Sequence, residues 1–204
     1  MIAIIEYGVG NCGSIGNMLR KLGHDAVITG DPVTISRADK LILPGIGAFD
    51  TAMQKLSERN LVPLLNERIL SRGVPILGIC LGMQLFGCGS EEGSTTGLGW
   101  IKARSARFRF ESPSRLKVPH MGWSSVSPSA RAEHTLALTP DARFYFVHSY
   151  HMVCSDPSDV LATCEYGKRF TAAVQRGNII GVQFHPEKSH KFGLRVLRTF
   201  ADAV

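Results

Sequence analysis

The sequence contains no long apolar run, no paired-cysteine motif and no run of basic residues. The first apolar stretch reaches only to Glu6, which is too short for the core of a signal peptide or for a membrane span, so we expect a soluble, cytoplasmic protein without a membrane partner. The cysteines form no C-x-x-C pair and are widely spaced: Cys12, Cys80, Cys88, Cys154 and Cys164. This odd and scattered set predicts free thiols rather than a zinc site, a redox couple or a disulfide framework, and nothing in it calls for a cofactor.

Signals for nucleic-acid binding are also missing, although the net charge is +6. Aromatic and basic residues do not alternate as they do in an RNA-binding strand, so we expect no nucleic-acid partner. Between Lys102 and Lys117 the only acidic residue is Glu111, and the basic residues are Lys102, Arg104, Arg107, Arg109, Arg115 and Lys117. A solvated basic edge is the favoured interpretation of this segment; for the net charge as a whole, a basic patch for an acidic protein partner also fits.

The chain has 204 residues, of which 44% are hydrophobic, which suffices for one substantial core. No break in composition suggests a second domain, and no internal repeat is present, so we expect a single domain over residues 1–204.

Residues 1–90 alternate between apolar runs and helical spacing. Strands are predicted at 2–6, 25–29, 40–44 and 74–79. One helix is predicted from an N-cap at Ser14 to a stop at Gly23, and another over 49–73 with a break near Pro63. Short β-prone runs then precede a closing helix at 193–203. We therefore expect an α/β fold with an open, mostly parallel central sheet, flanking helices, and added antiparallel strands in the second half.

The segment "PILGICLGMQLF" (75–86) places Gly78 and Gly82 on either side of Cys80. This G-x-nucleophile-x-G spacing is typical of a nucleophile elbow, in which glycines remove side chains that would clash at a sharp strand-to-helix turn. A cysteine at a helix N-terminus also has its thiolate favoured by the unpaired N–H groups. A small buried hydrophobic residue is the commoner fate of a cysteine, but the glycine pair favours a nucleophile.

A thiol nucleophile needs a base, and the base needs a group that orients it. The motif "GVQFHPEKS" offers both, because His185 and Glu187 are two residues apart and point to the same side of an extended chain. Glu187 would hold the imidazole of His185 toward Cys80. The His-Pro-Glu motif alone is weak evidence, and together with the elbow it is strong.

An oxyanion formed at Cys80 needs preorganised donors. One is expected to be the N–H of Leu81, the residue after the nucleophile. The other is expected from the glycine loop "PGIG", in which Gly45, Ile46 and Gly47 follow the strand at 40–44. An ordinary strand-to-helix turn is the alternative for this loop.

A metal site is not expected. His148 and His151 are candidate ligands, but in a β-prone run an offset of three residues sends them to opposite faces, and no third ligand is evident.

The motifs "GICLGMQ", "PGIGAF" and "GVQFHPEKS" resemble those of the class I (triad) glutamine amidotransferases. "YGVGN", "KVPHMGW" and "YFVHSY" narrow the resemblance, over essentially the whole chain, to HisH-like glutaminase subunits of imidazole glycerol phosphate synthase. The resemblance implies that Cys80 attacks the carboxamide of L-glutamine, that His185 protonates the departing ammonia and then activates water, and that Glu187 orients His185.

The resemblance also implies substrate contacts and a partner. Gln84, Gly47 and the backbone of Ser149 and Tyr150 would hold the glutamine. A HisF-like (β/α)-barrel synthase subunit would form a heterodimer with the chain and use the ammonia in histidine biosynthesis. The residues expected near that partner are Asn11, Met121, Trp123, Tyr145 and Lys188.

Three alternatives stay open. The segment "KSHKFG" resembles paralogues that supply ammonia for amidation of a surface-polysaccharide sugar. A cysteine hydrolase or peptidase is less favoured, because the adjacent His-Pro-Glu and the "GMQ" after the elbow argue against it. A catalytically silent assembly subunit would have no need of Cys80, His185 and Glu187 together.

Overall fold

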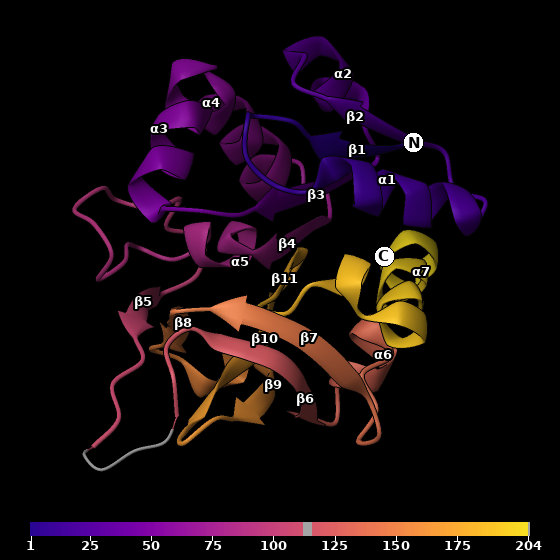
Figure 1. Ribbon diagram of the computed structural model, residues 1–204. Helices are drawn as coiled ribbons and strands as arrows, with labels where there is room; N and C mark the ends of the chain where they lie inside the picture. Colours follow the sequence, from indigo (N-terminus) through magenta and orange to yellow (C-terminus); the bar gives the residue numbers. More distant parts are fainter. Residues whose placement is uncertain (112–115, 204) are drawn as a thin grey trace.

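The computed structural model describes residues 1–111 and 116–203 (Figure 1). Its strands are β1 (Ile2–Ile5), β2 (Ala26–Thr29), β3 (Lys40–Gly45), β4 (Ile76–Cys80), β5 (Ala103–Arg107), β6 (His120–Pro128), β7 (Arg143–His148), β8 (Tyr150–Cys154), β9 (Val160–Glu165), β10 (Arg169–Arg176) and β11 (Ile179–Val182). Its α-helices are α1 (Cys12–Lys21), α2 (Pro32–Arg37), α3 (Phe49–Glu58), α4 (Leu61–Asn66), α5 (Leu81–Leu85), α6 (Ala132–Leu136) and α7 (His190–Ala203). Short helical turns of other types are η1 (Glu67–Ser71), η2 (Pro157–Asp159) and η3 (Pro186–Lys188).

One sheet runs through the molecule in the order β2-β1-β3-β4-β11-β10-β9-β6-β7. The strands from β2 to β11 in this order are parallel, and the pairing is antiparallel from β10 onward. Strands β5 and β8 pair separately as an antiparallel ribbon. The predicted fold class is therefore confirmed, including the antiparallel strands of the second half, which form the lower part of Figure 1.

The parallel strands β1, β3, β4 and β11 bury both of their faces, whereas the edge strand β2 is only partly buried. In β1, Ile2 and Ile4 belong to one hydrophobic cluster, whereas Ala3 and Ile5 belong to another. This alternation follows from the two-residue period of a strand. Helices α1 and α7 cover the first cluster, and α2, α3, α4 and α5 cover the second. Since β3, β4 and β11 are parallel neighbours, their carboxyl ends lie side by side at one edge of the sheet.

Two predicted helix boundaries are wrong. Helix α1 begins at Cys12 after the N-cap residue Asn11, so Ser14 is inside the helix and is not its cap. The helical stretch at 49–73 breaks at Asn60, which has the left-handed φ of 53°, and not at Pro63. Pro63 lies in the first turn of α4, where a helix needs no backbone N–H donor and so tolerates proline.

Helix α2 was not predicted, although its start has a recognisable signal. Asp31 caps it by accepting a hydrogen bond from the backbone N–H of Thr34 at 2.9 Å, and Pro32 occupies the first helical position. This pattern is favoured at helix N-termini. The helix has only 6 residues, so its apolar periodicity is too short to reveal it.

The basic residues at 102–109 lie on the exposed side of β5 and the residues that flank it, and Lys117 is exposed as well. Arg109 pairs with Glu91 at 2.7 Å, and Arg104 donates to the carbonyl of Ser90. Arg115 lies outside the described residues. These contacts agree with a solvated basic edge. Within residues 1–111 and 116–203, no helix is long and apolar enough to cross a membrane.

Candidate active site

Strand β4 ends at Cys80 and α5 begins at the next residue, so the chain turns from strand to helix at the thiol. Cys80 has φ 54° and ψ −110°, a conformation that costs a residue other than glycine about 1–3 kcal/mol. A Cβ on Gly78 would lie 2.6 Å from the ring of Phe86, and a Cβ on Gly82 would lie 1.9 Å from the carbonyl oxygen of Leu43. The two glycines are therefore needed because α5 packs tightly on the sheet at a sharp turn.

The loop after β3 lies beside this turn, because β3 and β4 are parallel neighbours and Gly45 pairs with Cys80. A Cβ on Gly45 would lie 2.7 Å from the backbone nitrogen of Gly82, so Gly45 permits close packing behind the turn. Ile46 and Gly47 follow it and line the cavity described below, and Gly47 has a positive φ of 90°.

His185 and Glu187 follow β11, which pairs with β4, and this brings the imidazole to the same edge as Cys80. Nδ1 of His185 lies 2.8 Å from Oε1 of Glu187. Since a carboxylate only accepts, Nδ1–H is the donor and Nε2 is left to face the thiol. Nε2 is buried and has no hydrogen-bond partner of normal geometry among the described residues. The backbone N–H of His185 donates to the carbonyl of Tyr145, which fixes the chain at this point.

The imidazole of His185 carries opposing influences on its pKa. Burial lowers the pKa, but the neighbouring Cys80 thiol and the Glu187 carboxylate outweigh burial and raise it to about 10. With this pKa the ring is protonated at neutral pH. A protonated imidazole beside a sulfur is the arrangement found in activated cysteine nucleophiles.

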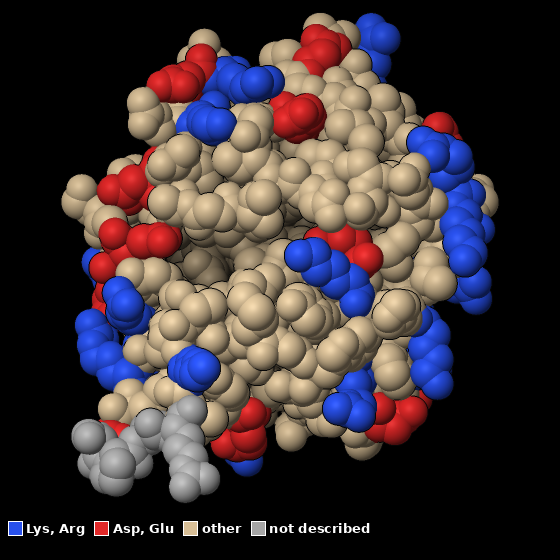
Figure 2. All heavy atoms as spheres, in the orientation of Figure 1, with Lys and Arg blue, Asp and Glu red and all other residues tan. Residues whose placement is uncertain are grey.

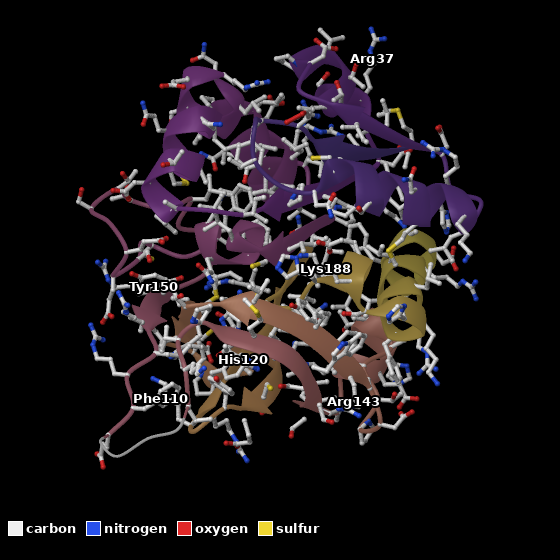
Figure 3. All side chains as sticks on the ribbon, viewed as in Figure 1. Arg37, Phe110, His120, Arg143, Tyr150 and Lys188 are labelled. Carbon is white, nitrogen blue, oxygen red and sulfur yellow. The ribbon has the colours of Figure 1, made fainter. Side chains whose placement is uncertain are left out.

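These groups surround a cavity of about 320 Å³. The predicted site residues that line it are Ile46, Gly47, Cys80, Leu81, Gln84, Ser149, Tyr150, His185 and Lys188. Gly45 and Glu187 are not among the lining residues, since Gly45 packs behind the turn and Glu187 contacts His185 from the side away from the cavity. In Figure 3, Lys188 lies between the two halves of the molecule and Tyr150 lies to its left.

Several residues of this site were not predicted: Pro119, Val147 and His148 line the cavity, and Glu92 and Gln183 make hydrogen bonds beside it. Glu92 lines the cavity, and its Oε2 accepts from the backbone N–H of Phe49 at 2.8 Å. It follows α5 in an irregular segment, where no periodicity marks a residue as facing inward. Gln183 is fully buried, and its Nε2 donates to the sulfur of Cys80 at 3.6 Å. Its place in "GVQFHPEKS", two residues before His185, is the only signal that could have revealed it.

Gln84 is held by two acceptors. Its Nε2 donates to the carbonyl of Tyr150 at 3.0 Å and to Oε1 of Gln183 at 2.9 Å. Both amide hydrogens are therefore used, and Oε1 is the group left for a ligand.

Four of the five residues predicted near a partner form one group beside the cavity. Met121 and Trp123 are 61% and 40% exposed, so neither side chain belongs to the hydrophobic core. Trp123 packs edge-on against Tyr145 with ring centroids 6.2 Å apart, and the ammonium of Lys188 lies 5.7 Å from the Tyr145 ring centroid. Asn11 precedes α1, which contacts η3, the turn that contains Lys188.

The prediction that His148 and His151 point to opposite faces is wrong. The alternation of β7 is interrupted at Ser149, which lies between β7 and β8, and both rings contact Phe108, with centroids 5.3 and 4.7 Å away. In the part of the chain that the structure describes, no three His, Cys, Asp or Glu side chains gather as metal ligands. All five cysteines are free, as predicted.

Comparison with known proteins gives concordant results. The model of the family "Glutamine amidotransferase class-I" matches residues 3–203. "Imidazole glycerol phosphate synthase subunit HisH 2" of Methanococcus maripaludis is 51% identical over 98% of each chain. The protein of the same name from Pseudomonas aeruginosa is 50% identical over 100% of each. A solved structure titled "Crystal structure of glutamine amidotransferase" superimposes with a TM-score of 0.72 over 98% of this chain and 96% of the other, at 18% identity, which supports the fold.

A full-length family match and two relatives that share half of their residues with this chain cannot arise from the fold alone. The chain therefore belongs to the class-I glutamine amidotransferases and, within them, to the family of HisH subunits.

Proposed function

We propose that this glutamine amidotransferase hydrolyses L-glutamine at Cys80, with His185 and Glu187 as its other catalytic residues, and passes the ammonia to a HisF-like (β/α)-barrel synthase that forms imidazole glycerol phosphate in histidine biosynthesis. One observation carries the proposal: a strained thiol and a carboxylate-bound imidazole follow adjacent parallel strands and line one cavity. The 204 residues act as one domain, and the free thiols suit the reducing cytoplasm.

In the first half of the reaction, the Cys80 thiolate attacks the side-chain carboxamide carbon of glutamine. A carbon–sulfur bond forms, and the carbonyl π-electrons move to oxygen. The N–H of Leu81 and the loop of Ile46 and Gly47 stabilise this oxyanion. The tetrahedral intermediate collapses, the carbon–nitrogen bond breaks, and protonated His185 gives its proton to the departing nitrogen, which leaves as ammonia.

In the second half of the reaction, the pKa of His185 falls. The thioester has no negative charge on sulfur, so one of the two influences that raise the His185 pKa is lost. The imidazole, now neutral, takes a proton from water as the water attacks the thioester carbon. The carbon–sulfur bond breaks and the thiolate and imidazolium are restored. The product carboxylic acid leaves and loses its remaining proton to solvent as glutamate. Glu187 keeps the ring oriented through both halves.

The cavity offers matching charges for the amino-acid end of glutamine. Glu92 supplies a carboxylate for the α-ammonium group of glutamine. The NH₂ group of Gln84 is already bound to protein acceptors, so its Oε1 can accept a hydrogen bond from the ligand. The Ser149 and Tyr150 backbone completes the wall on the side of β8.

A docked partner follows from the chemistry of the product. Ammonia released into water becomes ammonium, so an acceptor is best served by an enclosed path. Pro119 lines both the cavity and a neighbouring groove that includes Met121. In Figure 2 most charged side chains of this face lie toward its rim; near its centre a basic side chain lies beside an acidic one, and the surface around them is uncharged. Exposed aromatic and methionine side chains suit the centre of a protein interface.

Glutamate release from L-glutamine tests the proposal, measured for the chain alone and with the histidine-pathway barrel. We expect slow release by the chain alone and clear acceleration by the barrel, because release without an acceptor would waste glutamine and the Gly47 loop can turn a donor toward the oxyanion upon docking. Release at the full rate without any barrel would contradict the gating, and no release under either condition would contradict the function.

We predict that Trp123→Ala or Lys188→Ala weakens stimulation by the barrel by about 1–3 kcal/mol, as is typical of interface anchors. Basal glutamate release should persist in Trp123→Ala, because Trp123 does not line the cavity. Titration of each variant with the barrel gives the apparent affinity and the maximal stimulation. Val33→Ala is the matched control, because Val33 is a 55% exposed apolar residue on α2, at the top of Figure 1 and away from the cavity. Stimulation that is unchanged in both variants would refute this interface.

A second acceptor is a candidate because of one feature of the sequence. The segment "KSHKFG", which follows the triad motif, resembles that of paralogues in this family. A paralogous barrel that amidates a surface-polysaccharide sugar would use the same ammonia. Stimulation by that barrel and not by the histidine-pathway barrel would select this alternative.

A further inference from the structure

Three buried histidines have no part in the reaction described above. His120, His148 and His151 are 2%, 6% and 4% exposed and lie in an aromatic cluster that includes Phe108 and Phe170. Burial lowers their pKa values to about 4, about 3 and about 4, so all three are neutral at pH 7. A neutral imidazole has one donor and one acceptor nitrogen, so the donor and the acceptor of each hydrogen bond can be assigned.

His120 and His148 are directly opposite each other on β6 and β7, and they form a chain. Nδ1 of His148 lies 2.8 Å from the carbonyl oxygen of Tyr150, Nε2 of His148 lies 3.1 Å from Nδ1 of His120, and Nε2 of His120 lies 3.0 Å from the hydroxyl of Ser124. Because the Tyr150 carbonyl can only accept, Nδ1 of His148 carries the hydrogen. Its Nε2 must then accept from Nδ1–H of His120, whose Nε2 accepts from Ser124.

The Tyr150 carbonyl also fixes a second chain that leads to the nucleophile. It accepts from Nε2 of Gln84, which presents the same NH₂ group to Oε1 of Gln183. Gln183 is thereby oriented with its own NH₂ group toward the sulfur of Cys80. One carbonyl oxygen with both lone pairs engaged therefore joins the histidine pair to the Cys80 end of the cavity.

The turn between β7 and β8 is held on both of its carbonyls. The Ser149 carbonyl accepts from the backbone N–H of Phe108 at 3.0 Å, and the Tyr150 carbonyl accepts from His148 and Gln84. Since a peptide group is planar, fixing each carbonyl also fixes the N–H on the other side of the same peptide. This turn is part of the cavity wall, so its geometry decides how a ligand is held.

We propose that His120 and His148 are positioning residues for the glutaminase reaction: through the Tyr150 carbonyl they hold the Ser149–Tyr150 wall and Gln84 in place for the substrate. The proposal rests on the proposed function, because it names what positions the substrate site of that same reaction. His148 also lines the cavity, but among the described residues no hydrogen bond joins either histidine to Cys80 or His185. In Figure 3, His120 lies within the lower, antiparallel half of the molecule, away from Lys188 at the centre.

The kinetic test compares three variants of the full chain with its barrel partner. His148→Phe keeps the ring packing and removes the donor to Tyr150, so we expect the KM for glutamine to rise about tenfold, with a smaller change in kcat, as for a buried carbonyl that loses one partner. His148→Asn keeps an N–H at the position of Nδ1 and should restore most of the KM. His151→Phe is the matched control, because His151 contacts the same phenylalanines and neither of its ring nitrogens has a hydrogen-bond partner of normal geometry among the described residues.

A KM that is unchanged in His148→Phe, or raised equally in His151→Phe, would overturn the proposal, since packing alone would then account for the effect. Absence of glutamate release by the unaltered chain with any barrel would instead overturn the proposed function.

The nitrogen chemical shifts of the unaltered chain decide the matter even if His148→Phe does not fold. ¹⁵N NMR at pH 7 should show His120 and His148 neutral, each with its hydrogen on Nδ1. A hydrogen on Nε2 of His148, or a charged His148, would contradict the chain of hydrogen bonds on which the proposal rests.

Discussion

Replacing Cys80 with alanine is expected to abolish glutamate production while leaving the fold intact. Removing one member of a catalytic triad can be nearly as damaging as removing all three, on the order of a millionfold in a serine protease. The fold should survive because alanine fits the space and loses few packing contacts. Cys80 is small, and the turn depends on the glycines on either side of it.

The measurement is glutamate release with the barrel present, after contaminating glutaminase has been excluded, together with near-ultraviolet circular dichroism to confirm the fold. Cys88→Ala serves as the control, because Cys88 is a free and exposed thiol outside the cavity. Near-normal turnover by Cys80→Ala would remove the basis of the proposed mechanism.

The second large effect is expected from Glu187→Gln. The side chain keeps its shape but loses the charge that holds His185 in its tautomer, and the corresponding Asp→Asn change in a serine protease lowers kcat about 10⁴-fold. The pKa of His185, raised to about 10 by Cys80 and Glu187, should fall when one of these neighbours becomes neutral. NMR titration of the His185 ring and steady-state kinetics provide the two readouts.

Stability should follow the same pKa. Because the folded pKa of His185 lies above the unfolded value of 6.5, the protonated ring stabilises the fold fully below pH 6.5, and this contribution is lost as the pH rises toward 10. In Glu187→Gln the stabilising contribution of protonated His185 should be lost completely at a lower pH than in the unaltered chain. Glu165→Gln is the control, since Glu165 forms an exposed ion pair with Arg169. A His185 pKa that does not differ between Glu187→Gln and the unaltered chain would contradict the assigned role of Glu187.

The fold class and the region of the elbow could be predicted because short-range chemistry determines them. The two glycines around Cys80 indicate a turn that no other residue permits, and the structure gives the reason in the contacts of Gly78 and Gly82. Apolar runs that alternate with segments of helical apolar spacing were enough to predict the parallel strands. Helix boundaries at Asn60 and Cys12 were missed, because a left-handed residue and an uncapped N-terminus leave no clear local signal.

The remainder of the site depends on contacts between segments far apart in the sequence. Gln84 meets Gln183 across a separation of 99 residues, and Glu92 reaches the start of α3 across 43. His120 and His148 are brought together by strand register, which no spacing in the chain reveals. Residue patterns alone could rank His148 as a poor metal ligand, but they could not show that it donates a hydrogen bond to the Tyr150 carbonyl.

The central claim is that Cys80, and no other cysteine, is the nucleophile. The most direct test is to label the folded chain, with its barrel partner, with a chloroketone analogue of glutamine and to map the modified peptide by mass spectrometry. Exposure alone would favour Cys88, because Cys80 is only 6% exposed. We predict that Cys80 is labelled first and that excess glutamine protects it. Labelling of Cys88 or Cys12 ahead of Cys80, or labelling of Cys80 that glutamine does not slow, would contradict the account.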